Sequence, residues 1–367
     1  DRTFLGKLKS AWDTKFKQNP QLMLVLCGSV SSWIEKRLIT NRGFFGRISL
    51  KVRLKELSLP ECNAFWAGQG TSISVYEKLK ILSVTGGVPK YLEEINPALS
   101  ADHNIHKLCF SPNGFLCTDY DDLFSSMLER DSTLYQSIVE ALSHKKLQHA
   151  PLMEALQKQG GGIFSQYMNE LKLAGFVSID HTWNLRNGEL ARFSQYRLSD
   201  NYVRFYLKYM RAKFDKIETG GFEMHSLNAL PNWMGVMALQ VENLILNNRH
   251  ALHKWMGIFP DEVVCSGPFF QRKTARQKGC QIDYLVQTRA GVLYVCEIKF
   301  TRNIIRPSII EDMKQKISRI ARPKNTTAVP VLIHFGEVHD DVVGCQYFGK
   351  IINMAWLFGD NPELKIS

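Results

Sequence analysis

The strongest signal in the hydrophobic pattern is a pair of apolar, β-branched runs at 282–286 and 292–300, separated by Gln-Thr-Arg-Ala-Gly. Two such runs around a short glycine-containing connection predict a β-hairpin, with Gly291 supplying the turn. The second run is apolar at nearly every position, so both faces of its strand are expected to be buried. Three charged residues interrupt the two runs.

Those residues are Asp283, Glu297 and Lys299. Alternate residues of a strand share a face, so Glu297 and Lys299 point the same way, and Asp283 can lie across the hairpin from Glu297. Two carboxylates that converge suit Mg²⁺ with water in its remaining positions, which makes Asp283 and Glu297 the expected metal ligands. Lys299 would then orient or help deprotonate a water molecule and neutralise a phosphate under attack. The alternative is a Glu297–Lys299 ion pair with a structural role only.

This Asp, spacer, Glu-x-Lys arrangement resembles the PD-(D/E)XK nuclease superfamily, over 229–367. The chain departs from the family name in one respect, because Ile282 rather than proline precedes Asp283. The resemblance implies a leading helix whose Glu242 reaches the metal site. It also implies that the helix after the second strand carries a substrate-contacting glutamine, Gln315.

A second unit is predicted between Asp131 and Asp200, where three helical patterns precede two strand patterns. The helices are expected at 135–143, 149–159 and 163–175, the last ended by Gly175, and the strands at 176–179 and 194–198. This is winged helix-turn-helix order. Its third helix offers few basic residues beyond Lys172, so a spacer or packing role is favoured over the reading of DNA by this helix.

Three segments nearer the start, LMLVLCGSVSSWI, RGFFGRISLKVRLKELSLPE and GGVPKYLEEI, resemble the second half of the archaeal and bacterial ATPase family within the AAA+/STAND P-loop class. The hydrophobic pattern here predicts a helix at 1–17, a buried strand at 21–27 and a helix at 32–39. The resemblance implies that Ser29 senses the terminal phosphate of ATP, that Arg47 acts on this phosphate, and that GGVPK opens a helical lid. The alternative for Arg47 is a surface arginine in a turn.

No G-x-x-x-x-G-K-[ST] motif occurs in the chain. That motif supplies the backbone N–H groups and the lysine that hold the phosphates of ATP. We therefore expect either the C-terminal portion of an ATPase, with ATP bound only in a full-length protein, or a degenerate ATPase. Calorimetry is expected to give this chain a millimolar or weaker affinity for ATP, and a micromolar affinity would contradict the expectation.

Further apolar patterns predict helices at 202–214, 234–247 and 309–321, a strand at 327–335 and a strand or helix edge at 342–348. The aromatic residues of YVRFYLKYMRAKF recur at helical spacing, which favours a core over a surface that stacks bases. The expected fold class is multidomain α/β. Its units are a remnant of an AAA+ ATPase domain with its lid at 1–128, the winged helix-turn-helix at 129–200, a connecting helix at 201–228 and a restriction-endonuclease-like α/β domain at 229–367.

The net charge of the chain is +11, and its distribution matters more than its size. Between residues 272 and 324 there are thirteen Lys or Arg against four Asp or Glu, a net charge of +9. A basic field beside a phosphodiester-cleaving site attracts nucleic acid and makes binding salt-dependent. Arg272, Lys273, Arg276 and Lys278 precede the hairpin and are the expected nucleic-acid contacts, with a solvated basic face as the alternative.

The composition, 45% hydrophobic and 22% charged, is ordinary for a soluble protein, and no apolar run approaches the ~20 residues that cross a bilayer. The eight cysteines form no C-x-x-C motif, so a cytoplasmic protein without disulfides or zinc is expected. The expected partners are nucleic acid, with DNA favoured, and further copies of the chain joined through the ATPase part. Two functions stay open: a Mg²⁺-dependent nuclease coupled to an ATPase, and a non-catalytic STAND-type switch whose nuclease-like domain only binds nucleic acid or a protein partner.

Overall fold

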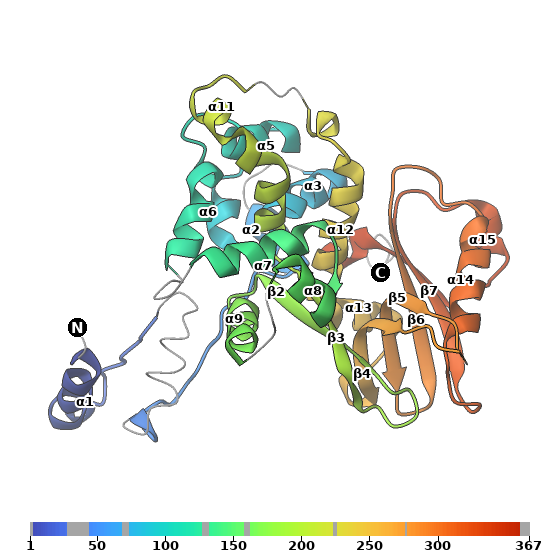
Figure 1. The fold of residues 1–367 in the computed structure, drawn as a ribbon, viewed down its shortest axis with the longest axis horizontal. Coiled ribbons are helices and arrows are strands. Elements are labelled where there is room, and N and C mark those ends of the chain that lie inside the picture. The colour runs from blue at the N-terminus through green and yellow to red at the C-terminus, as the bar shows by residue number, and fades with distance from the viewer. Residues whose placement is uncertain are drawn as a thin grey trace.

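The structure is a computed structural model that describes residues 3–27, 44–67, 73–126, 132–157, 162–222, 226–275 and 277–359. Within these ranges the protein is mixed α/β, with a helical body and two sheets, as the sequence predicts at this coarse level (Figure 1). Three expectations, the helix at 32–39 and the positions of Ser29 and Arg276, lie outside the described residues.

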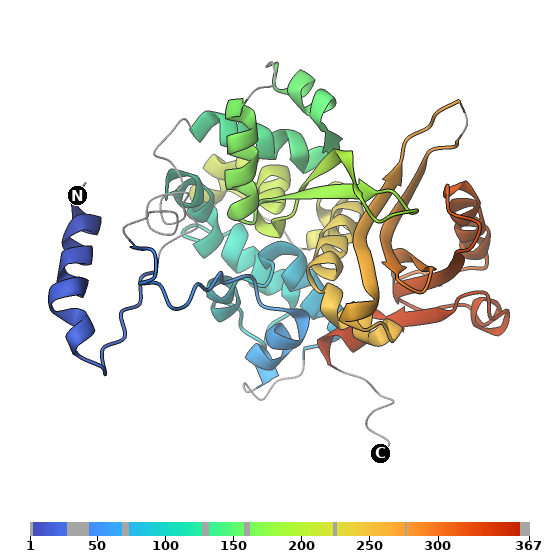
Figure 2. The same ribbon diagram turned by 90° about the horizontal axis from the view of Figure 1, so that it is seen from below.

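The first helix, α1 (Phe4–Thr14), lies apart from the body of the protein, as Figures 1 and 2 both show. A short 3₁₀ turn (Phe16–Gln18) and an extended segment follow it. The expectation of a buried strand at 21–27 is wrong, because the apolar side chains of 22–26 are between 39% and 84% exposed. The continuous apolar run does favour a strand, but a strand also needs a neighbour for its N–H and C=O groups. No described strand pairs with this segment.

The helical body begins with five helices, α2 (Leu59–Ala67), α3 (Val75–Thr85), α4 (Pro89–Glu93), α5 (Ala101–Cys109) and α6 (Phe115–Ser126). The turn between α3 and α4 needs two glycines. Gly86 has a φ of 60°, and a Cβ on Gly87 would lie 2.3 Å from the carbonyl oxygen of Leu57. The extended chain at Leu57 therefore lies directly against this turn, and its N–H donates to the Gly87 carbonyl at 2.7 Å.

The middle of the chain contains the three helices and the hairpin that the sequence predicts there. The elements are α7 (Ser132–His144), β1 (Leu147–Gln148), α8 (His149–Ala155), α9 (Gly162–Leu173), β2 (Val177–Trp183) and β3 (Leu190–Leu198). The strands form an antiparallel sheet in the order β1-β3-β2. Gly175 ends the third helix with a φ of 87°, a conformation that favours glycine.

The predicted helix at 202–214 is helical throughout but changes type along its length. It comprises α10 (Asn201–Phe205), a π-helical turn (Tyr206–Met210), a 3₁₀ turn (Arg211–Lys213) and the start of α11 (Phe214–Glu218). Tyr202, Phe205, Tyr206 and Tyr209 are buried, as the helical spacing favoured, and Phe214 is half-buried. A 3₁₀ turn (Leu227–Ala229) then leads to α12 (Trp233–Asn247).

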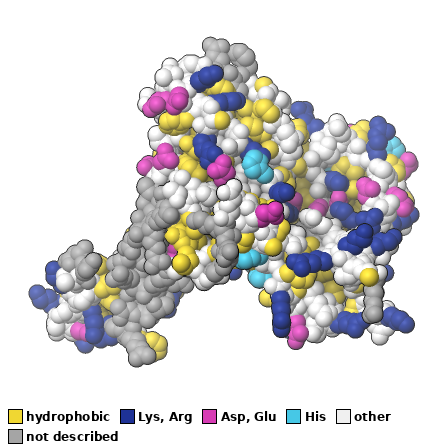
Figure 3. All heavy atoms as spheres, in the orientation of Figure 1, with side chains coloured by type: hydrophobic (Ala, Val, Ile, Leu, Met, Phe, Trp, Pro, Cys, Tyr) yellow, Lys and Arg dark blue, Asp and Glu magenta, His cyan; other side chains and the backbone are white. Residues whose placement is uncertain are grey.

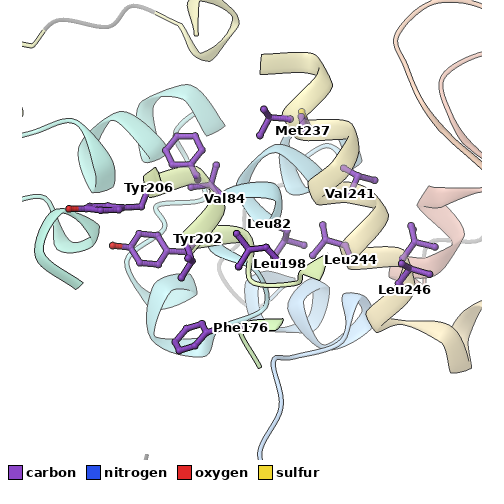
Figure 4. Packing of buried hydrophobic residues seen from close by; sticks show 14 of the residues in the cluster. Leu82, Val84, Phe176, Leu198, Tyr202, Tyr206, Met237, Val241, Leu244 and Leu246 are labelled. Carbon is purple, nitrogen blue, oxygen red and sulfur yellow. The ribbon is translucent and has the colours of Figure 1, made fainter. Parts of the chain in front are cut away.

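One hydrophobic cluster joins the helical body to the rest of the protein. Figure 4 shows where α3, α10 and α12 meet, with Leu82, Tyr202 and Leu244 packed around Leu198 at the end of β3. The same cluster runs on to the C-terminal 3₁₀ helix, η8 (Met354–Phe358). The segments predicted as separate units therefore share buried surface, and α12 lies at their junction.

The C-terminal sheet has the order β4-β5-β6-β7-β8. After α12 come α13 (Arg249–Met256), a 3₁₀ turn (Pro260–Glu262), β4 (Val263–Gln271), β5 (Cys280–Thr288), β6 (Val292–Phe300), α14 (Ser308–Arg319), β7 (Thr327–Phe335), α15 (Asp340–Gly344) and β8 (Lys350–Asn353). Strands β4, β5 and β6 are antiparallel neighbours, and β6, β7 and β8 are parallel. The segment 342–348 is part of α15 and the loop after it, so the last strand lies further along the chain than expected.

Different elements cover the two faces of β6. Leu293 and Val295 pack in the cluster that includes Met313 of α14, whereas Cys296 packs with Met256 on the side of α12 and α13. Figures 1 and 2 show α14 and α15 covering one face of the sheet and α12 and α13 the other. Successive side chains of β6 therefore point to opposite faces, as predicted. Gly291 makes the turn before this strand, with a φ of 74°.

Candidate functional site

The hairpin β5–β6 brings Asp283 and Glu297 to adjacent positions on neighbouring strands. Tyr284 pairs with Cys296, and the regular ladder stops there, although β6 continues to Phe300. On its other side β5 carries an extra residue, because Gly267 and Phe269 of β4 pair with Leu285 and Ile282. Such a bulge redirects side chains and is common beside active sites.

The Asp283 carboxylate, which lies at the bulge, is hydrogen-bonded to the backbone of β6. Its Oδ2 accepts a hydrogen bond from the backbone N–H of Ile298 at 2.9 Å, a bond that holds the side chain against β6. The next side chain on that strand, Glu297, has only 5% of its surface exposed. The two carboxylates are therefore neighbours at the edge of the regular ladder, close enough for the Glu297 charge to raise the pKa of Asp283.

Two lysines contact Glu297. The Lys299 Nζ lies 2.9 Å from Oε1, and Lys316 of α14 forms an ion pair with Oε2. The Lys299 side chain is 41% exposed and the Lys316 side chain 28%, so both are reachable from solvent while the carboxylate is not. Lys299 thus lies on the same side of the strand as Glu297, as the sequence predicts. Lys316 is a second lysine at this carboxylate, which the sequence analysis did not name.

The sequence contained a signal for Lys316 that the motif did not use. Ile309 and Met313 are the buried residues of α14, Ile320 follows directly after its end, and Lys316 falls on the same side at helical spacing. A lysine among apolar positions of an amphipathic helix needs a carboxylate partner. Glu297, the buried carboxylate on the sheet that α14 covers, is that partner.

Burial and neighbouring charges shift the pKa values of one carboxyl group and one lysine of the site. Burial and the neighbouring Glu297 charge raise the pKa of Asp283 to about 6, Glu242 adds to the effect, and Lys316 opposes it. Burial alone would lower the pKa of Lys316, but Asp283 and Glu297 outweigh it and the pKa lies above its ordinary value. A divalent cation between the two carboxylates would offset their mutual repulsion, which is the second of these causes after burial, and would compete with Lys299 and Lys316 for the Glu297 oxygens.

The donor set fits Mg²⁺ or a similar hard cation. Asp283 and Glu297 offer carboxylate oxygens, and Asp283 is only partly buried, so water can complete the coordination. Within the described ranges no group of three or more His, Cys, Asp or Glu side chains is placed to hold a metal. A cation held by these two carboxylates alone would keep several waters, as Mg²⁺ commonly does.

Glu242 and Gln315 take different positions relative to this pair. Glu242 is close enough to raise the pKa of Asp283, but its Oε1 also binds the Lys146 Nζ at 2.6 Å. Gln315 lies on the exposed side of α14, where its Oε1 accepts from Arg319 at 3.5 Å. The neighbouring Lys316, about 100° further round the helix, is the α14 side chain that reaches Glu297.

Arg47, the residue expected to act on a nucleotide phosphate, contacts α1 instead. Its Nε and Nη2 lie 3.0 and 2.9 Å from the two carboxylate oxygens of Asp13. Nothing in the described ranges brings Arg47 near a second residue of the expected nucleotide site, since Ser29 lies outside them.

The basic residues before β5 lie between the end of β4 and the start of β5, the strand that carries Asp283. The Arg272 guanidinium donates to the Gln148 Oε1 at 2.6 Å and lies 4.4 Å from the centre of the Phe193 ring. Lys273 and Lys278 are exposed. Lys and Arg side chains gather over the lobe formed by the C-terminal sheet (Figure 3). This distribution agrees with the charge pattern of the sequence.

No protein-family model matches the chain. The chain is 22% identical over 218 residues to an uncharacterized protein of Methanocaldococcus jannaschii, a match that covers 59% of this chain and 47% of that protein. A crystal structure of a protein from Vibrio cholerae aligns with a TM-score of 0.24 and 8% identity, over 68% of this chain and 52% of the other. The chain spans about half the length of each, and neither likeness shows a family or an activity. In the part of the chain that the structure describes, no helix is long and apolar enough to cross a membrane.

Divalent-cation affinity is expected to depend on the protonation of Asp283. Its folded-state pKa of about 6 lies above the ordinary 3.8, so the folded protein binds the proton more tightly than the unfolded chain. The metal-free protein should therefore lose stability as the pH rises through this interval, and added Mn²⁺ should offset the loss. Titrations at a series of pH values should show affinity falling about tenfold per unit below pH 6 and levelling off above it. Affinity that is constant across that interval would contradict this assignment.

Proposed function

We propose that this chain carries a divalent-metal-dependent phosphodiesterase site that acts on nucleic acid. The observation that carries the proposal is the convergence of Asp283 and Glu297 at the bulged end of a hairpin, with Lys299 on the same side. The elements around them follow the order that the resemblance to PD-(D/E)XK nucleases implies. A leading helix with Glu242 precedes the hairpin, and a helix and a parallel strand follow it.

The residues of the chain have separable roles in this proposal. Asp283 and Glu297 would hold Mg²⁺, which when bound polarises a phosphate oxygen and lowers the pKa of a coordinated water. The Ile298 N–H fixes the Asp283 carboxylate in position. Lys299 is the more exposed of the two lysines, so its ammonium can contact the phosphate or the attacking water. Lys316 supplies positive charge beside the buried Glu297.

Incubation of the purified chain with labelled DNA and RNA, single-stranded and duplex, tests the proposal. Cleavage that requires Mg²⁺ or Mn²⁺ and stops with a chelator is the expected result. Absence of cleavage on every substrate, together with absence of divalent binding, would overturn it.

A second candidate is the non-catalytic switch, and one contact supports it. Tyr76 in the first turn of α3 stacks on Phe300 at the end of β6 and on Phe335 at the end of β7, at 6.3 and 5.7 Å between ring centroids. Arg302 lies 5.0 Å from the centre of the Tyr76 ring. This cluster ties the helix that precedes the predicted lid to the strand that carries Lys299. Nucleic-acid binding without cleavage under any metal condition would favour this candidate over the nuclease.

A further inference from the structure

We infer that a groove between the β1–β3 edge and the C-terminal sheet binds a short single-stranded segment of nucleic acid next to the carboxylate pair. The inference deepens the proposed function and rests on it for the position of the cleaved bond. It assigns the unit at 132–198 a part in substrate binding that does not use the third helix of that unit.

The groove has a volume of about 390 Å³ and two distinct walls. Gln148 of β1 and Gln195 of β3 line one side. The other side comes from the end of β4, the start of β5 and α14, and includes Arg272, Lys316 and Arg319. Because Lys316 also forms the ion pair with Glu297, the groove leads directly to the proposed metal site.

The two walls are held in a fixed relation. The Trp183 Nε1 donates to the Gln287 Oε1 at 2.8 Å, and the Gln287 Nε2 donates to the Leu185 carbonyl at 3.0 Å. On the groove itself, Arg272 of the C-terminal sheet donates to Gln148 and lies against the Phe193 ring. The hairpin β2–β3 is therefore docked on the sheet (Figure 1), and the groove is a built feature of the fold.

The chemistry of the lining suits a nucleic-acid strand. Its charged side chains are all cationic, and no carboxylate is among the described residues that line it. The remaining polar side chains are glutamines, namely Gln148, Gln195, Gln271 and Gln281. An amide offers both a donor and an acceptor, so it can bind base edges, while Arg and Lys bind phosphates. Two of these amides are already engaged: that of Gln271 joins the Lys278 and Arg319 carbonyls and the Ala321 N–H, and the Gln148 Oε1 accepts from Arg272.

The size of the groove favours a single strand over a duplex. Its volume falls in the range of pockets that enclose a small ligand, about 300–1,000 Å³, which suits one or two nucleotides. Base edges are accessible to amide side chains in a narrow groove only when the bases are unpaired. A strand held here would place an adjoining phosphodiester beside Lys316 and the two carboxylates.

Binding measured with a chelator present separates the groove from catalysis. A short labelled single strand should bind the parent chain about tenfold or more tightly than the same sequence as a duplex. Gln195→Glu, which adds a negative charge to one wall, and Arg319→Ala, which removes a cation from the other, should each weaken single-strand binding by about tenfold at low salt. Unchanged thermal unfolding of both variants would show that they are folded.

Two variants outside the groove are matched controls. Gln18→Glu makes the same change of charge after α1, and Arg322→Ala removes an exposed arginine three residues beyond Arg319. Both should bind like the parent. Equal or tighter binding of the duplex, or equal loss in variants and controls, would overturn the inference. If Gln195→Glu and Arg319→Ala weaken binding but the parent never cleaves, the proposed function fails and the groove stands. If the parent cleaves and these variants bind as it does, only the groove fails.

Discussion

Replacing either carboxylate of the site, by Asp283→Asn or Glu297→Gln, is expected to reduce metal-dependent cleavage by at least about a thousandfold. Each variant removes a ligand charge, and a bound cation that activates water supplies several kcal/mol of transition-state stabilisation. The loss should fall on the rate of the chemical step, with binding of uncleaved single strand in a chelator kept within a few-fold. Single-turnover assays on a labelled strand measure the two effects separately.

Glu311→Gln is the matched control for the glutamate. Glu311 lies on α14 with its side chain 65% exposed, and its variant makes the same change of charge without touching the hairpin. It should cleave like the parent. Residual activity in Glu297→Gln at the level of this control would contradict the assignment of Glu297 as a ligand.

Asp180→Ala is expected to destabilise the fold by roughly 3–5 kcal/mol, because it leaves a buried guanidinium without its charge partner. The Nε of Arg197 lies 2.9 Å from the Asp180 Oδ2, and the two side chains are only 2% and 4% exposed. Arg197 also binds the Asn243 side chain on α12, so the pair joins the hairpin β2–β3 to the helix that carries Glu242. Urea unfolding measures the loss.

A double variant separates charge burial from packing at this site. Asp180→Leu combined with Arg197→Met replaces the ion pair by apolar side chains and should recover most of the stability lost in Asp180→Ala. A loss below about 1 kcal/mol in Asp180→Ala would show that solvent reaches Arg197 despite its low exposure. If the double variant loses as much stability as Asp180→Ala, the loss comes from altered packing and not from a buried unpaired charge.

The hairpin and the placement of its charged residues could be predicted because they depend on local pattern. Alternation with a period of two specifies which residues share a face, and Gly291 marks the turn. Glu297 and Lys299 therefore lie on the face that the sequence assigns them. No local pattern in the sequence predicts the bulge at Asp283. It arises because β5 has one residue more than β4 between the pairs Gly267–Leu285 and Phe269–Ile282, which depends on how the two strands pair.

Other features depend on contacts between distant segments, which a pattern along the chain does not specify. Lys316 was visible as a lysine on a buried stripe, but its partner depends on how α14 crosses the sheet. Gln315, one position earlier, lies on the exposed side of the same helix. The stretch 21–27 has the continuous apolar run of a buried strand, yet its apolar side chains are exposed. Hydrogen bonding to a neighbour decides whether such a stretch becomes a strand.

The alternative for the site is a Glu297–Lys299 ion pair with a structural role only. Because Lys316 also pairs with Glu297, this alternative predicts only a small effect of Lys299 on stability. Lys299→Met leaves Glu297 with Lys316 as a partner, and Lys299 is 41% exposed, so the stability loss should be about 1 kcal/mol or less. Lys316→Met removes the more buried partner and should cost more. Under the nuclease proposal Lys299→Met keeps metal affinity and loses cleavage rate.

Calorimetric titration of Mg²⁺ into the parent chain at neutral pH, repeated with Glu297→Gln and Lys299→Met, tests the central claim most directly. A site formed by Asp283 and Glu297 predicts one ion bound per chain, with the binding lost in Glu297→Gln and retained in Lys299→Met. Absence of binding in the parent, or binding that Glu297→Gln leaves unchanged, would contradict it.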